Sequence, residues 1–168
     1  MRLFAAIEFP DDVKRRLLEI QSDMRRLGVR GNYTKEDNFH ITLAFIGEWS
    51  DPEQVICALD KIAFNRFEVA LSGLGKFDAL WWVGVSRTEE LSSLALSVRD
   101  ALGKAGIPYD KKKFSPHITL IRKPSSGALP EIDFPSIRIS VGKVSLMRSD
   151  RAPDGVKYTR IASFNCKE

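Results

Sequence analysis

Apolar and polar positions along the chain follow two spacings, three or four residues in some stretches and two in others. An apolar run at 3–9 predicts a strand, and apolar residues recurring every three or four positions over 11–27 predict a helix that stops at Gly28. A polar stretch at 30–38 then leads to an apolar strand at 39–47. This first part of the chain therefore predicts the order strand, helix, strand.

The same order returns further along the chain. A strand is predicted at 80–86, followed by a helix that Thr88 can cap and Gly106 can end. The next predicted strand begins at His117, which lies 77 residues after His40. A repeated order of elements at one offset predicts two similar lobes.

The remaining segments complete the predicted fold. Ser50 and Glu53 have the spacing of a capping box and introduce another helix. Further strands are predicted at 67–77, 137–149 and 156–166, with a turn at 152–155 between the last two. No linker separates the halves. We therefore expect one bilobal domain over residues 1–168, of the α+β class, with antiparallel-rich sheets around a central cleft and helices outside.

Composition narrows the class of protein. The chain is 43% hydrophobic and 29% charged, as in soluble globular proteins, and no run approaches the roughly 18 apolar residues of a membrane span. Since the first residues also do not form a signal peptide, we expect a cytoplasmic monomer that does not bind membranes. The net charge of +4 favours an anionic partner without identifying one.

Both histidines of the chain open the same tetrapeptide, His-Ile-Thr-Leu. Side chains alternate along a strand, so His40 and Thr42 share one face, as do His117 and Thr119, while the intervening isoleucine and leucine face the core. If the lobes pack about a pseudo-two-fold axis, two imidazoles and two hydroxyls can meet across the cleft.

Such a pair suits phosphodiester chemistry. A neutral imidazole can remove a proton from water while a protonated one supplies a proton to the leaving oxygen, and a pKa of about 6.5 allows either state. Threonine hydroxyls could hold phosphate oxygens, and Arg122 could neutralise charge. Arg122 is out of register with His117 and Thr119, so its place in the site requires a β-bulge or a strand end, and a surface ion pair is the alternative.

The chain resembles a known family in three stretches, "RLFAAIEFPDDV", "HITLAFIGE" and "HITLIRKP". They are similar to the RNA 2',3'-cyclic phosphodiesterases, also called 2'-5' RNA ligases, of the two-histidine phosphoesterase superfamily with its paired HxTx motifs. The resemblance implies hydrolysis of an RNA terminal 2',3'-cyclic phosphate to a 2'-phosphomonoester and reversible 2'-5' ligation, with tRNA halves among the partners. No metal or other cofactor is expected.

The same resemblance implies a role for each site residue. His40 would donate a proton to the departing 3' oxygen, and His117 would activate water. Thr42 and Thr119 would bind the phosphate, and Arg122 matches the basic residue after the second motif. From the residues alone, either histidine could be the donor.

Three alternatives stay open at this point. A metal hydrolase could use the histidines, although no HExxH motif or carboxylate cluster accompanies them. The basic charge would also suit a non-enzymatic RNA-binding module. A phosphodiesterase could instead act on ADP-ribose 1'',2''-cyclic phosphate or on 2'-5' oligoadenylates. Four aromatic residues could stack on bases, although core packing is the expected role of each: Phe9, Phe45, Trp49 and Tyr109.

Overall fold

The computed structural model describes residues 1–134 and 136–168. Its helices are α1 (Asp11–Arg26), α2 (Pro52–Leu59) and α3 (Glu89–Lys104), with a short 3₁₀ turn at Glu36–Asn38. The strands of the first half are β1 (Arg2–Ile7), β2 (Asn32–Tyr33), β3 (Ile41–Glu48) and β4 (Phe67–Phe77). Those that follow are β5 (Leu80–Val85), β6 (His117–Arg122), β7 (Arg138–Val141), β8 (Lys143–Ala152) and β9 (Gly155–Asn165).

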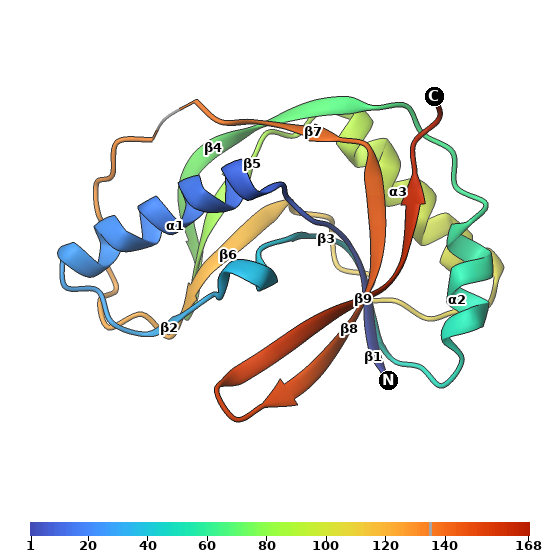
Figure 1. Cartoon of the computed structure of the whole chain (residues 1–168), viewed down its shortest axis with the longest axis horizontal. Coiled ribbons are helices and arrows are strands. Elements are labelled where there is room, and N and C mark those ends of the chain that lie inside the picture. The colour runs from blue at the N-terminus through green and yellow to red at the C-terminus, as the bar shows by residue number, and fades with distance from the viewer. Residues whose placement is uncertain (135) are drawn as a thin grey trace.

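Two antiparallel sheets form the body of the molecule (Figure 1). One has the strand order β3-β1-β8-β9 and the other the order β2-β6-β5-β4-β7. The two histidine strands, β3 and β6, come close to each other between the sheets. The predicted α+β class, with antiparallel sheets in two lobes, is confirmed.

Local signals account for the ends of the two long helices. The hydroxyl of Thr88 accepts a hydrogen bond from the Leu91 amide at 3.1 Å, as expected of an N-cap. Gly28 and Gly106 follow α1 and α3 with φ of 85° and 73°, a left-handed conformation that glycine adopts without a Cβ clash. The predicted start of α3 and both glycine stops are therefore confirmed.

Each of the two long helices contacts the histidine strand of the other half of the repeat. Gln21 of α1 donates to the Leu120 carbonyl of β6, and Arg99 of α3 donates to the Leu43 carbonyl of β3. In Figure 1, α1 lies over the sheet that contains β6, whereas α3 lies beside β3 and α2 lies beside α3. Each long helix therefore covers the sheet that holds the other half's histidine strand.

One cluster of buried side chains joins the sheets and helices. It includes fully buried leucines from all three helices and both histidine strands, namely Leu17, Leu59, Leu102, Leu43 and Leu120. Burying such a side chain contributes about 1.5–3 kcal/mol, so the cluster makes a firm support for the two strands.

Three details differ from the sequence prediction. The N-cap of α2 is Asp51 rather than Ser50, because the Asp51 carboxylate accepts from the Gln54 amide at 3.2 Å. The predicted strand at 137–149 is two strands, β7 and β8, which separate at Gly142 and enter different sheets. The polar stretch at 30–38 contains β2, which pairs with β6.

No helix in the part of the chain described is both long and apolar enough to cross a membrane.

Candidate active site

A β-bulge follows the threonine of each His-Ile-Thr-Leu motif. The pairing of β1 with β3 skips Leu43, and the pairing of β5 with β6 skips Leu120, which is the equivalent residue. An extra residue reverses the alternation of faces, so Phe45 and Arg122 turn to the same side as the histidine and threonine before them. The bulge that Arg122 required is therefore present, and the first motif has one as well.

Gln21 holds the second bulge from outside the cavity. Its side-chain amide donates to the Leu120 carbonyl at 3.0 Å and to the Thr34 carbonyl at 2.9 Å, and the residue is only 1% exposed. A buried amide with both hydrogens engaged has little freedom to move. Gln21 therefore links the bulge of β6 to the neighbouring wall of the cavity.

Arg99 does the same at the first bulge. Its Nε donates to the Leu43 carbonyl at 3.1 Å and one terminal nitrogen donates to the Lys112 carbonyl at 2.8 Å. Lys112 belongs to the segment that leads to His117. Arg99 thus connects the strand of the first histidine to the approach of the second.

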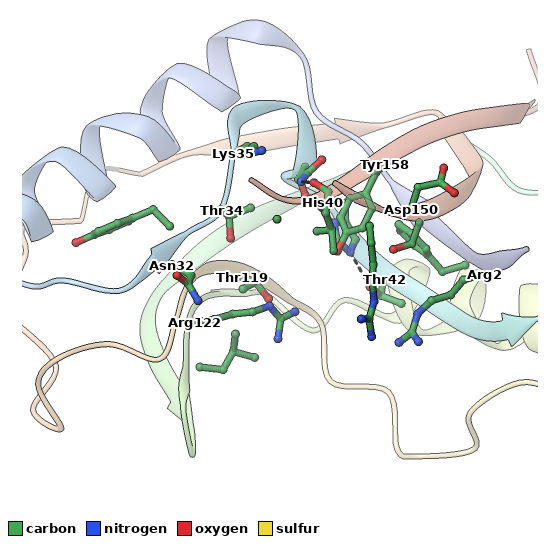
Figure 2. Close-up of a pocket in the computed structure, with 18 of the residues that line it drawn as sticks. Arg2, Asn32, Thr34, Lys35, His40, Thr42, Thr119, Arg122, Asp150 and Tyr158 are labelled. Atoms are coloured by element: carbon green, nitrogen blue, oxygen red, sulfur yellow. Dashed lines mark hydrogen bonds between the residues drawn. The ribbon is translucent and has the colours of Figure 1, made fainter. Parts of the chain in front are cut away.

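A cavity of about 1280 Å³ opens between the sheets, and every site residue predicted from the sequence lines it: His40, Thr42, His117, Thr119 and Arg122. In Figure 2, His40 and Thr42 lie on one side of the opening, and Thr119 and Arg122 lie on the other. The fold therefore brings the two motifs together as the strand alternation predicted.

Both imidazoles are oriented by a backbone carbonyl two residues earlier. The Nδ1 of His40 lies 2.8 Å from the Asn38 oxygen, and the Nδ1 of His117 lies 2.7 Å from the Ser115 oxygen. Because a carbonyl only accepts, Nδ1 carries the hydrogen in both rings, and Nε2 is left to exchange protons. In the neutral His40 ring, Nε2 accepts from the Thr42 hydroxyl at 2.9 Å.

Aromatic rings pack against both imidazoles. Centroid separations run from 5.0 to 6.1 Å: Phe4 and Tyr158 lie beside His40, and Phe77 and Trp82 lie beside His117. Rings held between two aromatic neighbours have few rotamers to choose from. Each histidine is therefore fixed by both a hydrogen bond and packing.

The enclosure of His40 changes its protonation. Burial lowers its pKa to about 4, and the positive charges of His117 and Arg122 act in the same direction, against the hydrogen bond to Asn38 and the charge of Glu8. His40 is therefore neutral near pH 7 when the cavity holds no ligand.

Glu8 is part of a polar group next to this site that no motif in the sequence indicated. Its carboxylate accepts from Ser145 Oγ and Arg160 Nε, each at 2.7 Å. Burial raises the Glu8 pKa, but the hydrogen bonds from Arg160 and Ser145 outweigh it and leave the pKa lowered. Glu8 therefore stays ionised.

The cavity carries an excess of positive charge. Three of its carboxylates lie next to a cation: Asp150 next to Arg148, Asp154 next to Lys35, and Glu48 next to the Met1 amino group. Among the residues described, four arginines line the cavity without an ion pair: Arg2, Arg25, Arg122 and Arg151. Uncompensated guanidinium groups in a cavity favour an anionic ligand.

Across residues 1–134 and 136–168, no group of three or more His, Cys, Asp or Glu side chains is placed to hold a metal ion.

Comparison with known proteins identifies the family. The family model of the 2'-5' RNA ligase superfamily matches residues 9–153. The chain belongs to this superfamily. The family expected from the sequence is thus confirmed. This chain is an enzyme rather than a non-catalytic RNA-binding module.

Relatives named RNA 2',3'-cyclic phosphodiesterase match most of this chain. The protein of Archaeoglobus fulgidus is 30% identical over 98% of this chain and 99% of its own length. The protein of Aeropyrum pernix is 35% identical over 70% of this chain and 71% of its own, and that of Thermotoga maritima is 29% identical over 94% and 91%. These matches support cyclic phosphodiesterase activity in this chain.

Solved structures share the fold. Escherichia coli LigT complexed with 3'-AMP superposes with a TM-score of 0.84 at 24% identity, covering 99% of this chain and 98% of LigT. A protein of Thermus thermophilus superposes with a TM-score of 0.79 at 28% identity, covering 98% of this chain and 97% of its own. These structures and this chain therefore share one fold.

Proposed function

We propose that this enzyme hydrolyses the 2',3'-cyclic phosphate at an RNA end to a 2'-phosphomonoester, with His40 and His117 as catalytic residues. The observation that carries the proposal is that both Nε2 atoms, oriented by carbonyls on Nδ1, belong to one cavity with unpaired arginines. This is the arrangement that proton transfer on both sides of an anionic phosphate requires.

In the proposed reaction, His117 Nε2 removes a proton from water as the water oxygen bonds to phosphorus. The bond from phosphorus to the 3' oxygen breaks, and that oxygen takes the proton from His40 Nε2. The 2' ester bond remains. Thr42 and Thr119 donate hydrogen bonds to the non-bridging oxygens, and Arg122 balances their negative charge.

The donor role requires that the substrate raise the pKa of His40. In the ligand-free cavity this pKa is lowered to about 4 by burial and by the charges of His117 and Arg122. A cyclic phosphodiester bears one negative charge, which would lie against these two cations and offset their effect on His40. Substrate binding would then prepare the donor.

No step of this reaction uses a metal ion. The same groups also serve the reverse reaction, because an RNA 5'-hydroxyl can take the place of water and form a 2'-5' linkage. We include this ligation in the proposal, with tRNA halves among its substrates. Water is far more abundant, so hydrolysis should dominate.

The size and charge of the cavity favour a polynucleotide end. Its volume of about 1280 Å³ exceeds the roughly 300–1,000 Å³ of ordinary small-molecule pockets. Four arginines that form no ion pair with the described residues are also more than one cyclic phosphate needs. ADP-ribose 1'',2''-cyclic phosphate has further phosphates and is the second candidate.

Three expectations accompany the proposal. Residues 1–168 would act as one bilobal domain, because one cluster of buried side chains joins both sheets. The enzyme would work as a monomer, which its mass in solution would test. A cytoplasmic location stays a prediction, to be tested by cell fractionation.

The test is hydrolysis of an RNA oligomer ending in 2',3'-cyclic phosphate, with EDTA present and with the 2'- and 3'-phosphate products resolved. The proposal predicts the 2'-phosphate at a rate that EDTA does not change. A 3'-phosphate product, or loss of activity with EDTA, would contradict the mechanism. Turnover of ADP-ribose 1'',2''-cyclic phosphate without turnover of RNA would favour the second candidate.

A further inference from the structure

The two lobes place different side chains at the equivalent position after the bulge. In the second lobe this residue is Arg122, and in the first lobe it is Phe45, which lies 77 residues earlier. Both line the cavity. The pseudo-symmetry therefore puts a guanidinium group on one side and an aromatic ring on the other.

Arg2 restores a guanidinium group on the side of the ring. It lies on β1, next to β3, and its guanidinium carbon is 4.9 Å from the centre of the Phe45 ring. Stacking on an aromatic face orients a planar guanidinium group while leaving its hydrogens available. Figure 2 shows Arg2 and Arg122 reaching the opening from opposite sides.

Arg2 is available to an anion. It is exposed and lines the cavity, and no carboxylate pairs with it in the part of the chain described. Its register partner across β1 and β3 is Glu48, whose carboxylate lies 3.1 Å from the Met1 amino group instead. The Arg2 guanidinium therefore has no counter-ion among residues 1–134 and 136–168.

Both arginines are exposed side chains that line the cavity. Burial raises the pKa of Tyr158, the ring beside His40, and the charges of Arg122 and Arg2 both oppose this effect. The charge of Arg122 also helps to lower the pKa of His40. Arg122 is therefore near the reacting phosphate. Arg2 lies over the Phe45 ring, in the wall of the cavity formed by β1 and β3.

We propose that Arg2, stacked on Phe45, binds the phosphodiester on the 5' side of the terminal nucleotide, so that the site selects an RNA end over an isolated cyclic nucleotide. The inference rests on the proposed function. The terminal nucleotide of an RNA carries two anions, its cyclic phosphate and the 5' phosphodiester that joins it to the chain. A planar guanidinium fork fits the second anion, which a simple nucleoside 2',3'-cyclic phosphate lacks.

The test uses two substrates that differ in one group, a nucleoside 2',3'-cyclic phosphate with and without a 5'-phosphate. For the wild type, kcat/KM should be about tenfold or more higher with the 5'-phosphate, the usual size of a hydrogen bond to a charged group. The ratio of the two kcat/KM values is the readout, because general effects on chemistry cancel in it. Arg2→Gln should bring the ratio to within about threefold of one, by the same reasoning.

Two further variants separate the role of Arg2 from changes in charge or folding. Arg15→Gln removes the same charge from an exposed position on α1 outside the cavity and should keep the wild-type ratio. Phe45→Leu keeps Arg2 but removes the ring that orients it, and should give an intermediate ratio. Arg2→Lys should do the same, because an ammonium group lacks the planar fork.

The outcomes distinguish this inference from the proposed function. If the wild type hydrolyses neither the two nucleotides nor the RNA oligomer, the proposed function itself fails. If it hydrolyses both nucleotides with equal kcat/KM, or if Arg2→Gln keeps the preference, Arg2 does not bind the 5'-phosphate. If Arg15→Gln lowers the ratio as much as Arg2→Gln, the preference reflects overall charge and the inference is wrong.

Discussion

Lowering the pH from 7 to 5 should destabilise the protein through His40. Its pKa is about 4 in the folded state and about 6.5 in the unfolded chain, so acid favours the unfolded state, which binds the proton more readily. Each unit of pH below 6.5 costs about 1.4 kcal/mol until the pH approaches 4. At pH 5 the contribution of His40 to the free energy of unfolding should have fallen by about 2 kcal/mol.

The assay is urea unfolding of the wild type and of His40→Gln at pH 7 and pH 5. Glutamine does not titrate, so the wild type should lose about 2 kcal/mol more than the variant over this interval. Glu8 has a lowered pKa, so its stabilising contribution is lost only as the pH falls below its usual range near 4.5, and it is present in both proteins. His117→Gln is the matched control, because it removes the other imidazole of the cavity and keeps that of His40. It should lose more free energy than His40→Gln over this interval, although slightly less than the wild type, because the charge of His117 also lowers the pKa of His40. If the wild type and His40→Gln lose the same free energy within about 0.5 kcal/mol, the burial of a neutral His40 is refuted.

Three other predictions concern catalysis. The activity should have a bell-shaped dependence on pH. The limb that reports the proton of His40 should lie at higher pH in kcat than in kcat/KM, because bound phosphate raises the pKa of His40. Coincident limbs in the two profiles would count against this shift. Gln21→Leu should lower kcat about tenfold with little change in KM by misplacing the bulge. Gln54→Leu removes another hydrogen bond from a side-chain amide to a backbone carbonyl, that of Ala105 after α3, and should leave kcat unchanged. Steady-state kinetics would show equal effects if Gln21 only stabilises the fold. Gly75→Ala should lower kcat because a Cβ there would collide with the Trp82 ring, which packs on the imidazole of His117. An unchanged kcat in a folded variant would show that this packing does not position the imidazole.

Local patterns were sufficient to predict much of the fold and the cavity. The repeated motif and the alternation of side chains predicted that four motif residues would share a cleft. The mismatch of Arg122 required a β-bulge or a strand end if Arg122 was to reach the site, and the pairing of β6 contains a bulge. Thr88 and Gly106 marked the ends of α3 because caps depend on neighbouring backbone groups. Such features are decided within a few residues, so the sequence displays them.

Features that depend on distant partners could not be predicted in this way. The alternation of the run at 137–149 changes phase at Gly142 and Lys143, where β7 ends and β8 begins. The two halves join different sheets, a choice that depends on which edges the rest of the fold leaves free. Gln21 contacts a carbonyl 99 residues away. Its only signal in the sequence is that an uncharged polar residue lies on the apolar face of α1. Phe45 was expected in the core, but the first bulge turns it toward the cavity.

The most direct test of the central claim is the single-turnover rate of cyclic phosphate hydrolysis in His40→Ala, His117→Ala and the double variant. If the two imidazoles act as one acid-base pair, each single change should cost at least about 10²-fold. The double variant should then be little slower than either single variant, because residues that act as a unit are not additive. A single variant within tenfold of the wild-type rate, with chemistry shown to be rate-limiting, would contradict the account.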